Sequence, residues 1–240
     1  MLAPVYDEWH ESLRLEWVTR VETHLARYGS MRDGLSFLDL GCGTGTLLVA
    51  MRARHPSWRL MGVDASAAML AEAKRKPRAD TVDWLHAAFE DVRGTGGFDV
   101  VGCFFDALNH LLRDGALAKA VEAASAALVP GGLLIFDLNN QRGCEEGSLT
   151  RSSVSCRTWG VSSDTIFDPH TRVETTRLKV RLQAGSPVET VLRRRCFTPE
   201  EVATALDAAG FAVELEEAWS LARGQTLGKT WYVARKRQGR

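Results

Sequence analysis

The order of strand-like and helix-like segments from residue 35 to about residue 138 restricts the fold of this chain more than any other feature. Short apolar runs predict strands at Leu35–Leu40, Trp58–Val63, Thr81–His86, Phe98–Phe104 and Leu133–Leu138. Segments with helical character separate these runs, near 46–54, 66–75 and 115–128. Parallel strands need long crossover connections, which are usually helices. This order therefore predicts a doubly wound α/β fold, with helices on both faces of a parallel sheet.

A helix is expected before the first strand. Apolar side chains recur at every fourth position and form one stripe, at Trp9, Leu13, Trp17, Val21 and Leu25. The helix is expected to end near Tyr28 and Gly29, because glycine is the common residue just past a helix C-terminus. We expect residues 1–30 to form a helical cap on the sheet.

From about Ser148 to Cys196 the pattern changes to an alternation of apolar and polar residues. Leu178, Val180 and Leu182 alternate with polar neighbours, which is the period of a β-strand. Turn sequences at 168–171 (Asp-Pro-His-Thr) and 184–187 (Ala-Gly-Ser-Pro) divide the segment into hairpins. We therefore predict an inserted antiparallel sheet over about 148–196.

The last part of the chain predicts a helix and two strands. Thr198-Pro199-Glu200-Glu201 has the residues of a capping box, and Gly210 is expected to end the helix that follows. The segments 211–217 and 230–235 are expected to form a terminal hairpin across the polar stretch 222–229. The whole chain, residues 1–240, is interpreted as one domain.

Composition excludes several classes of partner. The 30 Lys and Arg residues balance 30 Asp and Glu residues, so no overall charge attracts nucleic acid or an anionic membrane. No stretch approaches the roughly 18 apolar residues of a membrane span, and the start lacks the pattern of a signal peptide, so we expect a cytoplasmic protein. The cysteines have neither C-x-x-C nor metal-ligand spacing, so we expect reduced thiols and no metal site: Cys42, Cys103, Cys144, Cys156 and Cys196.

The turn after the first strand has glycine at every second position, at Gly41, Gly43 and Gly45. Glycine permits positive φ and lets a ligand approach the backbone closely. Nineteen residues after Gly45, Asp64 ends the second strand, where an acidic side chain in nucleoside-binding α/β folds accepts hydrogen bonds from ribose hydroxyls. An ordinary tight turn and a helix cap are the structural alternatives for these residues.

Two neighbouring residues argue against a dinucleotide. Thr46 stands where the dinucleotide fingerprint places a third glycine. Asp39 precedes the turn, where its charge would repel a pyrophosphate and attract a cationic ligand. The pattern favours a sulfonium amino acid over NAD.

At these residues the chain resembles the class I S-adenosylmethionine-dependent methyltransferases. The resemblance rests on 38–45, on 62–66 with Met69 and Leu70, on 98–101 and on 130–134. It implies a seven-stranded Rossmann-like sheet with a terminal antiparallel hairpin. It also implies S-adenosylmethionine as cofactor, S-adenosylhomocysteine as product, and a cofactor site at Asp39, Gly41, Gly43, Gly45, Asp64, Ala65 and Met69, in which Asp39 lies near the methionine part. The family's acidic residue for adenine aligns with Ala88, so Phe89, Glu90 or Asp91 is expected to serve instead.

The acceptor is expected at the end of the fourth strand, because ligands of open α/β sheets bind beyond the carboxyl ends of the strands. Phe104 and Phe105 are core residues in one interpretation, and Phe104 faces the sulfonium in the other. His110 is either a general base or an ordinary histidine. Asp106 and Asn109 either orient the acceptor or cap the following turn, and Asn139 and Asn140 are further candidates.

The early Tyr6-Asp7, the inserted sheet and the segment 195–201 resemble the small-molecule branch of the family, among sugar-amine and amino-acid N-methyltransferases. This resemblance implies that Tyr6 and the N-terminal helix cover the cofactor, and that the inserted sheet is a lid or a homodimer surface. Arg193, Arg194 and Arg195 either meet an acidic substrate or form an exposed basic strand face.

The functional hypothesis is methyl transfer to a small molecule by in-line displacement, mainly through proximity and orientation, with nitrogen slightly favoured over oxygen. A NAD-type oxidoreductase on the same fold and a non-catalytic S-adenosylmethionine-binding protein are the alternatives.

Overall fold

The computed structural model describes residues 2–10, 14–92, 95–146, 150–183, 186–219 and 228–238. The helices are α1 (Ala3–Trp9), α2 (Arg14–Arg27), α3 (Thr46–Arg54), α4 (Ala67–Arg75), α5 (Ala116–Ala127), α6 (Gln141–Glu146) and α7 (Pro199–Ala208). The strands are β1 (Ser36–Leu40), β2 (Arg59–Asp64), β3 (Asp83–His86), β4 (Phe98–Cys103), β5 (Leu128–Asn139), β6 (Arg151–Ser155), β7 (Trp159–Asp168), β8 (Val173–Leu182), β9 (Val188–Arg195), β10 (Phe211–Trp219) and β11 (Lys229–Lys236). Short 3-10 turns occupy Ala79–Thr81, Phe89–Asp91 and Ala107–His110.

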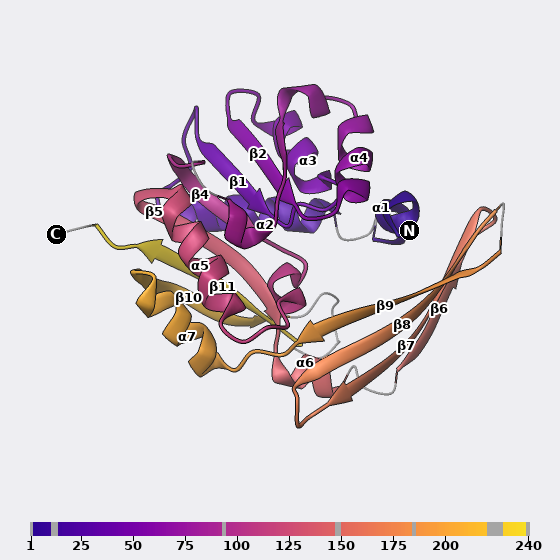
Figure 1. Ribbon diagram of the computed structural model, residues 1–240. Coiled ribbons are helices and arrows are strands. Elements are labelled where there is room, and N and C mark those ends of the chain that lie inside the picture. Colours follow the sequence, from indigo (N-terminus) through magenta and orange to yellow (C-terminus); the bar gives the residue numbers. More distant parts are fainter. Residues whose placement is uncertain are drawn as a thin grey trace.

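The larger sheet has seven strands in the order β10-β11-β5-β4-β1-β2-β3. The pairs from β5 to β3 are parallel, while β11 is antiparallel to both β5 and β10. The predicted doubly wound sheet with a terminal antiparallel hairpin is confirmed (Figure 1).

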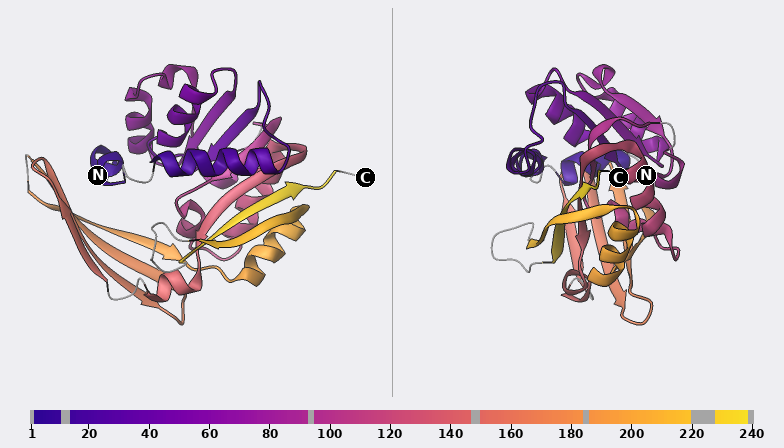
Figure 2. Two further views of the ribbon diagram at one scale, coloured as in Figure 1. Left: turned by 180° about the vertical axis from the view of Figure 1, so that it is seen from behind. Right: turned by 90° about the vertical axis from the view of Figure 1, so that its left-hand side faces the viewer.

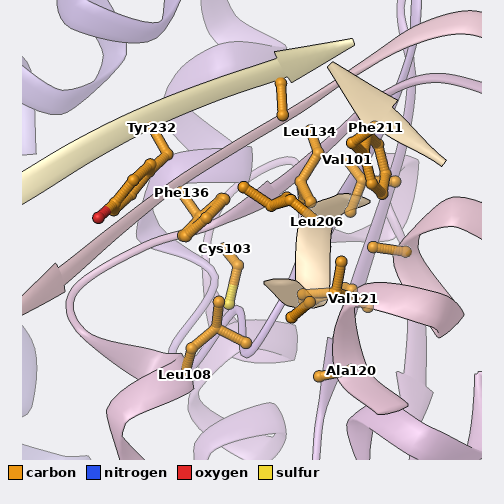
Figure 3. Packing of buried hydrophobic residues seen from close by; sticks show 14 of the residues in the cluster. Val101, Cys103, Leu108, Ala120, Val121, Leu134, Phe136, Leu206, Phe211 and Tyr232 are labelled. Carbon is orange, nitrogen blue, oxygen red and sulfur yellow. The ribbon is translucent and has the colours of Figure 1, made fainter. Parts of the chain in front are cut away.

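Helices cover both faces of this sheet. Adjacent residues of β1 point to opposite sides, so Phe37 packs with buried residues of α2 and α3, while Leu38 packs with those of α5 and α7. On the second side, Phe136 of β5 and Tyr232 of β11 stack with ring centroids 4.8 Å apart. Leu206 lies beside Phe136, and Phe211 of the same cluster lies beside Leu134 and Val101 (Figure 3). The two buried layers fix the strands, and therefore fix the sheet edge at which β1, β2 and β4 end.

The four-stranded antiparallel sheet has the order β6-β7-β8-β9 and extends away from the larger sheet as a curved arm (Figures 1 and 2). Val5 of α1 packs against one face of this arm, on Trp159, Val161, Leu178 and Val180. The predicted inserted sheet is therefore present, and its inner face is partly covered by the N-terminal helix.

The 168–171 turn is confirmed, since the Asp168 carboxylate accepts hydrogen bonds from the His170 backbone and the Thr171 hydroxyl. The predicted turn at 184–187 lies partly outside the described residues, and most of 222–229 lies outside them.

The structure differs from the prediction in several places. β5 begins at Leu128, before the glycines that interrupt the apolar run, and α6 was not predicted. The expected single N-terminal helix was wrong in one respect: Trp9 ends α1 and packs with the arm, whereas Trp17 belongs to α2 and packs under the larger sheet. Leu13 of the same stripe lies outside the described residues.

No helix among the described residues is long and apolar enough to cross a bilayer.

Candidate active site

A cavity of about 630 Å³ lies at the edge of the larger sheet where β1, β2 and β4 end. Its lining includes Tyr6, Asp7, His10, Trp17, Asp39, Gly41, Gly43, Thr44, Thr46, Asp64, Ala65, Ser66, Met69, Phe89, Glu90, Phe104, Phe105, His110, Arg113 and Leu192. The structure thus brings together most of the residues expected at the cofactor, from the turn after β1, the end of β2 and the turn after β3. The cavity size is typical of a small-ligand site.

The backbone of the glycine turn forms one wall of the cavity. The amides of Gly41 and Cys42 both donate to the Val63 carbonyl, at 2.8 and 3.0 Å, which bends the chain sharply after β1. Gly41 has φ of 76°, and a Cβ atom there would lie 2.9 Å from the Ala107 Cβ. Only glycine fits this position without strain.

Gly45 has a different place from the other two glycines. It precedes α3 with φ of 68° and lies outside the cavity lining. A Cβ atom there would lie 2.3 Å from the ring of Trp84. Close packing against Trp84 and positive φ account for this glycine, and its expected contact with the cofactor stays a prediction.

Asp64 ties the turn to the end of β2. Its Oδ2 accepts from the Gly43 amide at 2.8 Å, and its Oδ1 accepts from the Ser66 amide at 2.7 Å. The helix cap of α4 is Ser66, whose hydroxyl accepts from the Met69 amide. Asp64 is therefore not the cap, and its remaining lone pairs are available to hydroxyl donors in the cavity.

Asp39 is buried beside the turn and lines the cavity. Its Oδ1 has no hydrogen-bond partner among the described residues. Burial, with a smaller contribution from the charge of Asp64, raises the pKa of Asp39 to about 8. A buried carboxyl with a spare oxygen suits a cationic ligand group, which would restore its charged form.

α1 is fastened to the same wall by Asp7. The Asp7 carboxylate accepts from the hydroxyls of Thr44 and Thr46, at 2.6 and 2.8 Å, and forms an ion pair with Lys76 at 2.6 Å. Burial opposes ionisation, but these bonds hold the pKa of Asp7 below its usual range. No pattern in the residue types indicated this contact, which brings Tyr6 and His10 to the cavity.

Beyond the turn, the cavity is bounded by residues after β3 and β4. The Phe89 ring lies against Gly41, and Glu90 forms an ion pair with Arg113 at 2.6 Å. Ala88, where the family's acidic residue was expected, also lines the cavity. Glu90 is thus the acidic side chain of this part of the lining, and it is already paired.

Aromatic rings form another part of the cavity lining. Phe104 is buried, and Phe105 stacks on Trp17 with ring centroids 4.2 Å apart. Phe105 and Asp106 have φ of 58° and 52°, a left-handed conformation that is unfavourable for residues with side chains. Two such residues in succession mark a strained turn held by its surroundings.

The three catalytic candidates have different environments. His110 is exposed and lines the cavity. Asn109 is fully buried outside the lining, and its amide group bonds the backbone of Asn139 and the carbonyl of Arg195. Of its two alternatives, the geometry favours a structural role for Asn109.

Asp106 belongs to a buried cluster of charges outside the cavity lining. Its carboxylate pairs with Lys229 at 2.8 Å and Arg194 at 2.9 Å; Lys229 also pairs with Asp137 at 2.8 Å, and Arg194 with Glu174. Burial opposes ionisation, but the two cations hold the pKa of Asp106 well below its usual range. The cluster therefore joins β4, β5 and β11 to the arm.

The three consecutive arginines of β9 have separate roles. Arg194 lies in the buried charge cluster, whereas Arg195 pairs with Asp114 and Glu201. Arg193 is exposed. None of the three lines the cavity among the described residues, so the geometry gives no support to contact with an acidic substrate there.

Comparisons with known proteins agree with this geometry. The family described as "Methyltransferase domain" matches residues 37–132. A methyltransferase of Geobacillus sp. (strain WCH70) is 34% identical over 140 residues, which are 55% of this chain and 55% of that protein, so the match spans about half the length of that relative. A dTDP-3-amino-3,6-dideoxy-alpha-D-glucopyranose N,N-dimethyltransferase of Streptomyces fradiae is 28% identical over 80% of this chain and 76% of its own length.

Among solved structures, CalS10 of Micromonospora echinaspora, an amino pentose methyltransferase with bound S-adenosylmethionine, is similar at 27% identity and a TM-score of 0.71. The match covers 95% of this chain and 91% of that one. Residues 37–132 thus form a methyltransferase domain, and over most of its length the chain is similar to class I S-adenosylmethionine-dependent methyltransferases. As in that family, the cofactor is S-adenosylmethionine. The predicted resemblance to the small-molecule branch of the family is confirmed. The oxidoreductase alternative has no support.

The residues of this methyltransferase fit the cofactor. The turn at Gly41 has no room for a side chain, the Asp39 carboxyl has a spare buried oxygen, and Asp64 has lone pairs left for hydroxyl donors. The described residues contain no group of three metal-ligating side chains.

Proposed function

We propose that this chain transfers the methyl group of S-adenosylmethionine to the amine of an amino sugar. The amino group of the cofactor is assigned to Asp39, its ribose to Asp64 and its adenine to the wall formed by Phe89 and Glu90. Ala65 and Met69, which line the same part of the cavity, complete this set. When bound, the cofactor supplies an activated methyl group on a sulfonium, so the protein has to orient the acceptor and exclude water.

The charge of the cavity lining carries the choice of an amine. Four carboxyl side chains line the cavity, those of Asp7, Asp39, Asp64 and Glu90, whereas Arg113 is the single Lys or Arg of the described lining. Arg113 is paired with Glu90. The described lining therefore offers no unpaired Lys or Arg to hold a carboxylate acceptor, which favours an amine over an acid.

The hydroxyl of Tyr6 is a second polar group that suits an amino sugar. Burial, followed by the charges of Asp106, Asp64, Asp7 and Asp137, raises the pKa of Tyr6 well above its ordinary value. Tyr6 therefore remains a neutral phenol in a negative field, suited to a hydrogen bond with an amine or a sugar hydroxyl. The names of the Streptomyces fradiae relative and of CalS10 support an amino sugar as the acceptor.

The test compares two acceptors of opposite charge. The protein is incubated with S-adenosylmethionine carrying a labelled methyl group and with either dTDP-3-amino-3,6-dideoxy-α-D-glucopyranose or a tricarboxylic acid, and the products are identified by mass spectrometry. We expect a labelled N-methyl product from the amine alone. A methyl ester from the acid, or an O-methylated sugar, would contradict the assignment of nitrogen.

The organisation as a single domain, and a homodimer through the arm, remain proposals. Sedimentation velocity at several protein concentrations tests the homodimer. If the dimer forms through the arm, its population should rise with concentration, and a variant with altered arm residues should dissociate more readily.

A further inference from the structure

His10 lines the cavity, although the sequence analysis did not identify it as a candidate site residue. It follows the last residue of α1, and the Asp7 contacts hold this helix against the glycine turn. Its ring is half-buried, lines the cavity and lies 4.4 Å from the Tyr6 ring, centroid to centroid. His10 therefore belongs to the part of the cavity wall that the N-terminal helix contributes.

The hydrogen bonds of His10 fix its tautomer. The Nδ1 atom lies 2.9 Å from the backbone carbonyl of Tyr6, which accepts hydrogen bonds and has none to donate. Nδ1 must therefore carry the hydrogen, which in the neutral ring leaves a lone pair on Nε2. Among the described residues, Nε2 has no hydrogen-bond partner.

The surroundings keep this imidazole neutral. Burial lowers the pKa of His10, and the Tyr6 carbonyl, Asp106 and Asp7 oppose that shift without reversing it. Asp7 is neutralised by Lys76, and Asp106 by Lys229 and Arg194. Tyr6 is uncharged. His110, in contrast, is an exposed residue of the lining and ends the 3-10 turn after β4.

We infer that His10 is the general base for the acceptor, with Nε2 as the atom that takes the proton. This inference rests on the proposed function. An amino sugar arrives as an ammonium ion, which has no lone pair to attack carbon. One N–H bond breaks, its electron pair stays on the acceptor nitrogen, and the proton binds to Nε2. The nitrogen then bonds to the methyl carbon while the carbon–sulfur bond breaks and its electron pair leaves with sulfur. The imidazolium finally returns its proton to solvent.

The matched variants are His10→Asn and His10→Gln. The Asn amide nitrogen overlaps the position of Nδ1, so His10→Asn keeps the hydrogen bond to Tyr6 and loses the basic atom. We expect kcat/KM for dTDP-3-amino-3,6-dideoxy-α-D-glucopyranose to fall at least about tenfold near pH 7 in both variants. The loss should shrink as the pH approaches the pKa of the free amine, because solvent then removes the proton. His170→Asn, in the turn of the arm, is the control histidine.

A purely structural role for His10 would give a loss that does not change with pH, and this result would overturn the inference. Unchanged kcat/KM in His10→Asn, or the pH-dependent loss appearing in His110→Asn instead, would also overturn it. Calorimetry with S-adenosylhomocysteine establishes that α1 is still in place, since His10→Asn should bind it with wild-type affinity.

Nitrogen-15 NMR of labelled protein tests the base without turnover. The His10 signals, identified by their absence in His10→Asn, should show Nε2 unprotonated and Nδ1 protonated at neutral pH. The opposite tautomer, or an imidazolium at neutral pH, would refute the inference even if methylation occurs. If the wild type methylates no amine while the NMR result is as expected, the proposed acceptor fails and the protonation state of His10 stands.

Discussion

Replacing Lys229 by methionine should destabilise this protein severely. Lys229 is 6% exposed, and its Nζ lies 2.8 Å from both the Asp106 and the Asp137 carboxylates. Three carboxyl groups and two cations make up the cluster, the third acid being Glu174 and the second cation Arg194. Methionine has a similar length and no charge, so the variant leaves three buried acids with one cation.

The magnitude follows from the burial of both partners. Breaking a buried ion pair by removing one partner costs about 3–5 kcal/mol, because an uncompensated charge remains in the protein interior. For a chain of this size, each kcal/mol lowers the Tm by about 2–4 °C, so a decrease of roughly 6–20 °C is expected. The double variant Lys229→Met/Asp137→Asn should recover part of that loss, since it removes one acid along with the base.

Urea unfolding followed by tryptophan fluorescence measures these free energies. In the wild type, burial already raises the pKa of Asp137 against the opposing effect of Lys229. A carboxyl whose pKa is higher in the folded than in the unfolded state costs stability above its unfolded pKa, and protonation on acidification relieves that cost. The difference in the free energy of unfolding between the wild type and Lys229→Met should therefore become smaller as the pH is lowered from about 7 to 5. A loss below about 1 kcal/mol, or a difference that widens in acid, would refute the reasoning.

Three further predictions concern the cofactor. Because the pKa of Asp39 is about 8, Asp39 is protonated in the free protein at neutral pH, and binding of the cofactor's ammonium group should release this proton. Calorimetry in buffers of different ionisation enthalpy should detect the proton release, and a release of the same size in Asp39→Asn would contradict the assignment. Asp64→Ala should weaken S-adenosylhomocysteine binding more than about tenfold, whereas Ser66→Ala, which loses a cap, should change it by less than about threefold; equal effects would assign Asp64 to helix capping. Gly41→Ala should weaken binding at least about tenfold, because its Cβ would lie 2.9 Å from that of Ala107, and unchanged affinity would show that the turn tolerates a side chain.

The order of elements was predictable because its signals are local. The helix at Pro199–Ala208 is an example: the Thr198 hydroxyl accepts from the Glu201 amide, and the Glu201 carboxylate accepts from the Thr198 amide. Both bonds lie within four residues, so the residue types alone reveal them. Reliance on local signals also explains why the start of β5 was missed. Gly131 and Gly132 interrupt the apolar run that identifies a strand, although β5 begins at Leu128.

The cofactor wall was predictable where one continuous segment builds it. Asp39 and Gly41 belong to the same turn, and Asp64 follows at a spacing that a strand–helix–strand unit fixes. The contacts of Asp7 with Thr46 and Lys76 were not predictable, because they join three helices that are distant in sequence. Thr46 entered the sequence argument as a missing glycine, and its hydroxyl in fact anchors the N-terminal helix.

The polar residues after β4 show where sequence reasoning must stop. Asp39 and Asn109 are both buried polar side chains at strand ends, and both were candidates for contact with a ligand. The amide of Asn109 is occupied by backbone groups of Asn139 and Arg195, and backbone groups give no signal in the residue types. Asp39 keeps a buried oxygen without a partner among the described residues. An unpaired buried polar atom is costly unless a ligand completes it, and Asp39, unlike Asp137 with its similar spare oxygen, also lines the cavity. Spare hydrogen-bonding capacity at the cavity, visible only in three dimensions, therefore separates the candidate binding residue from the structural ones.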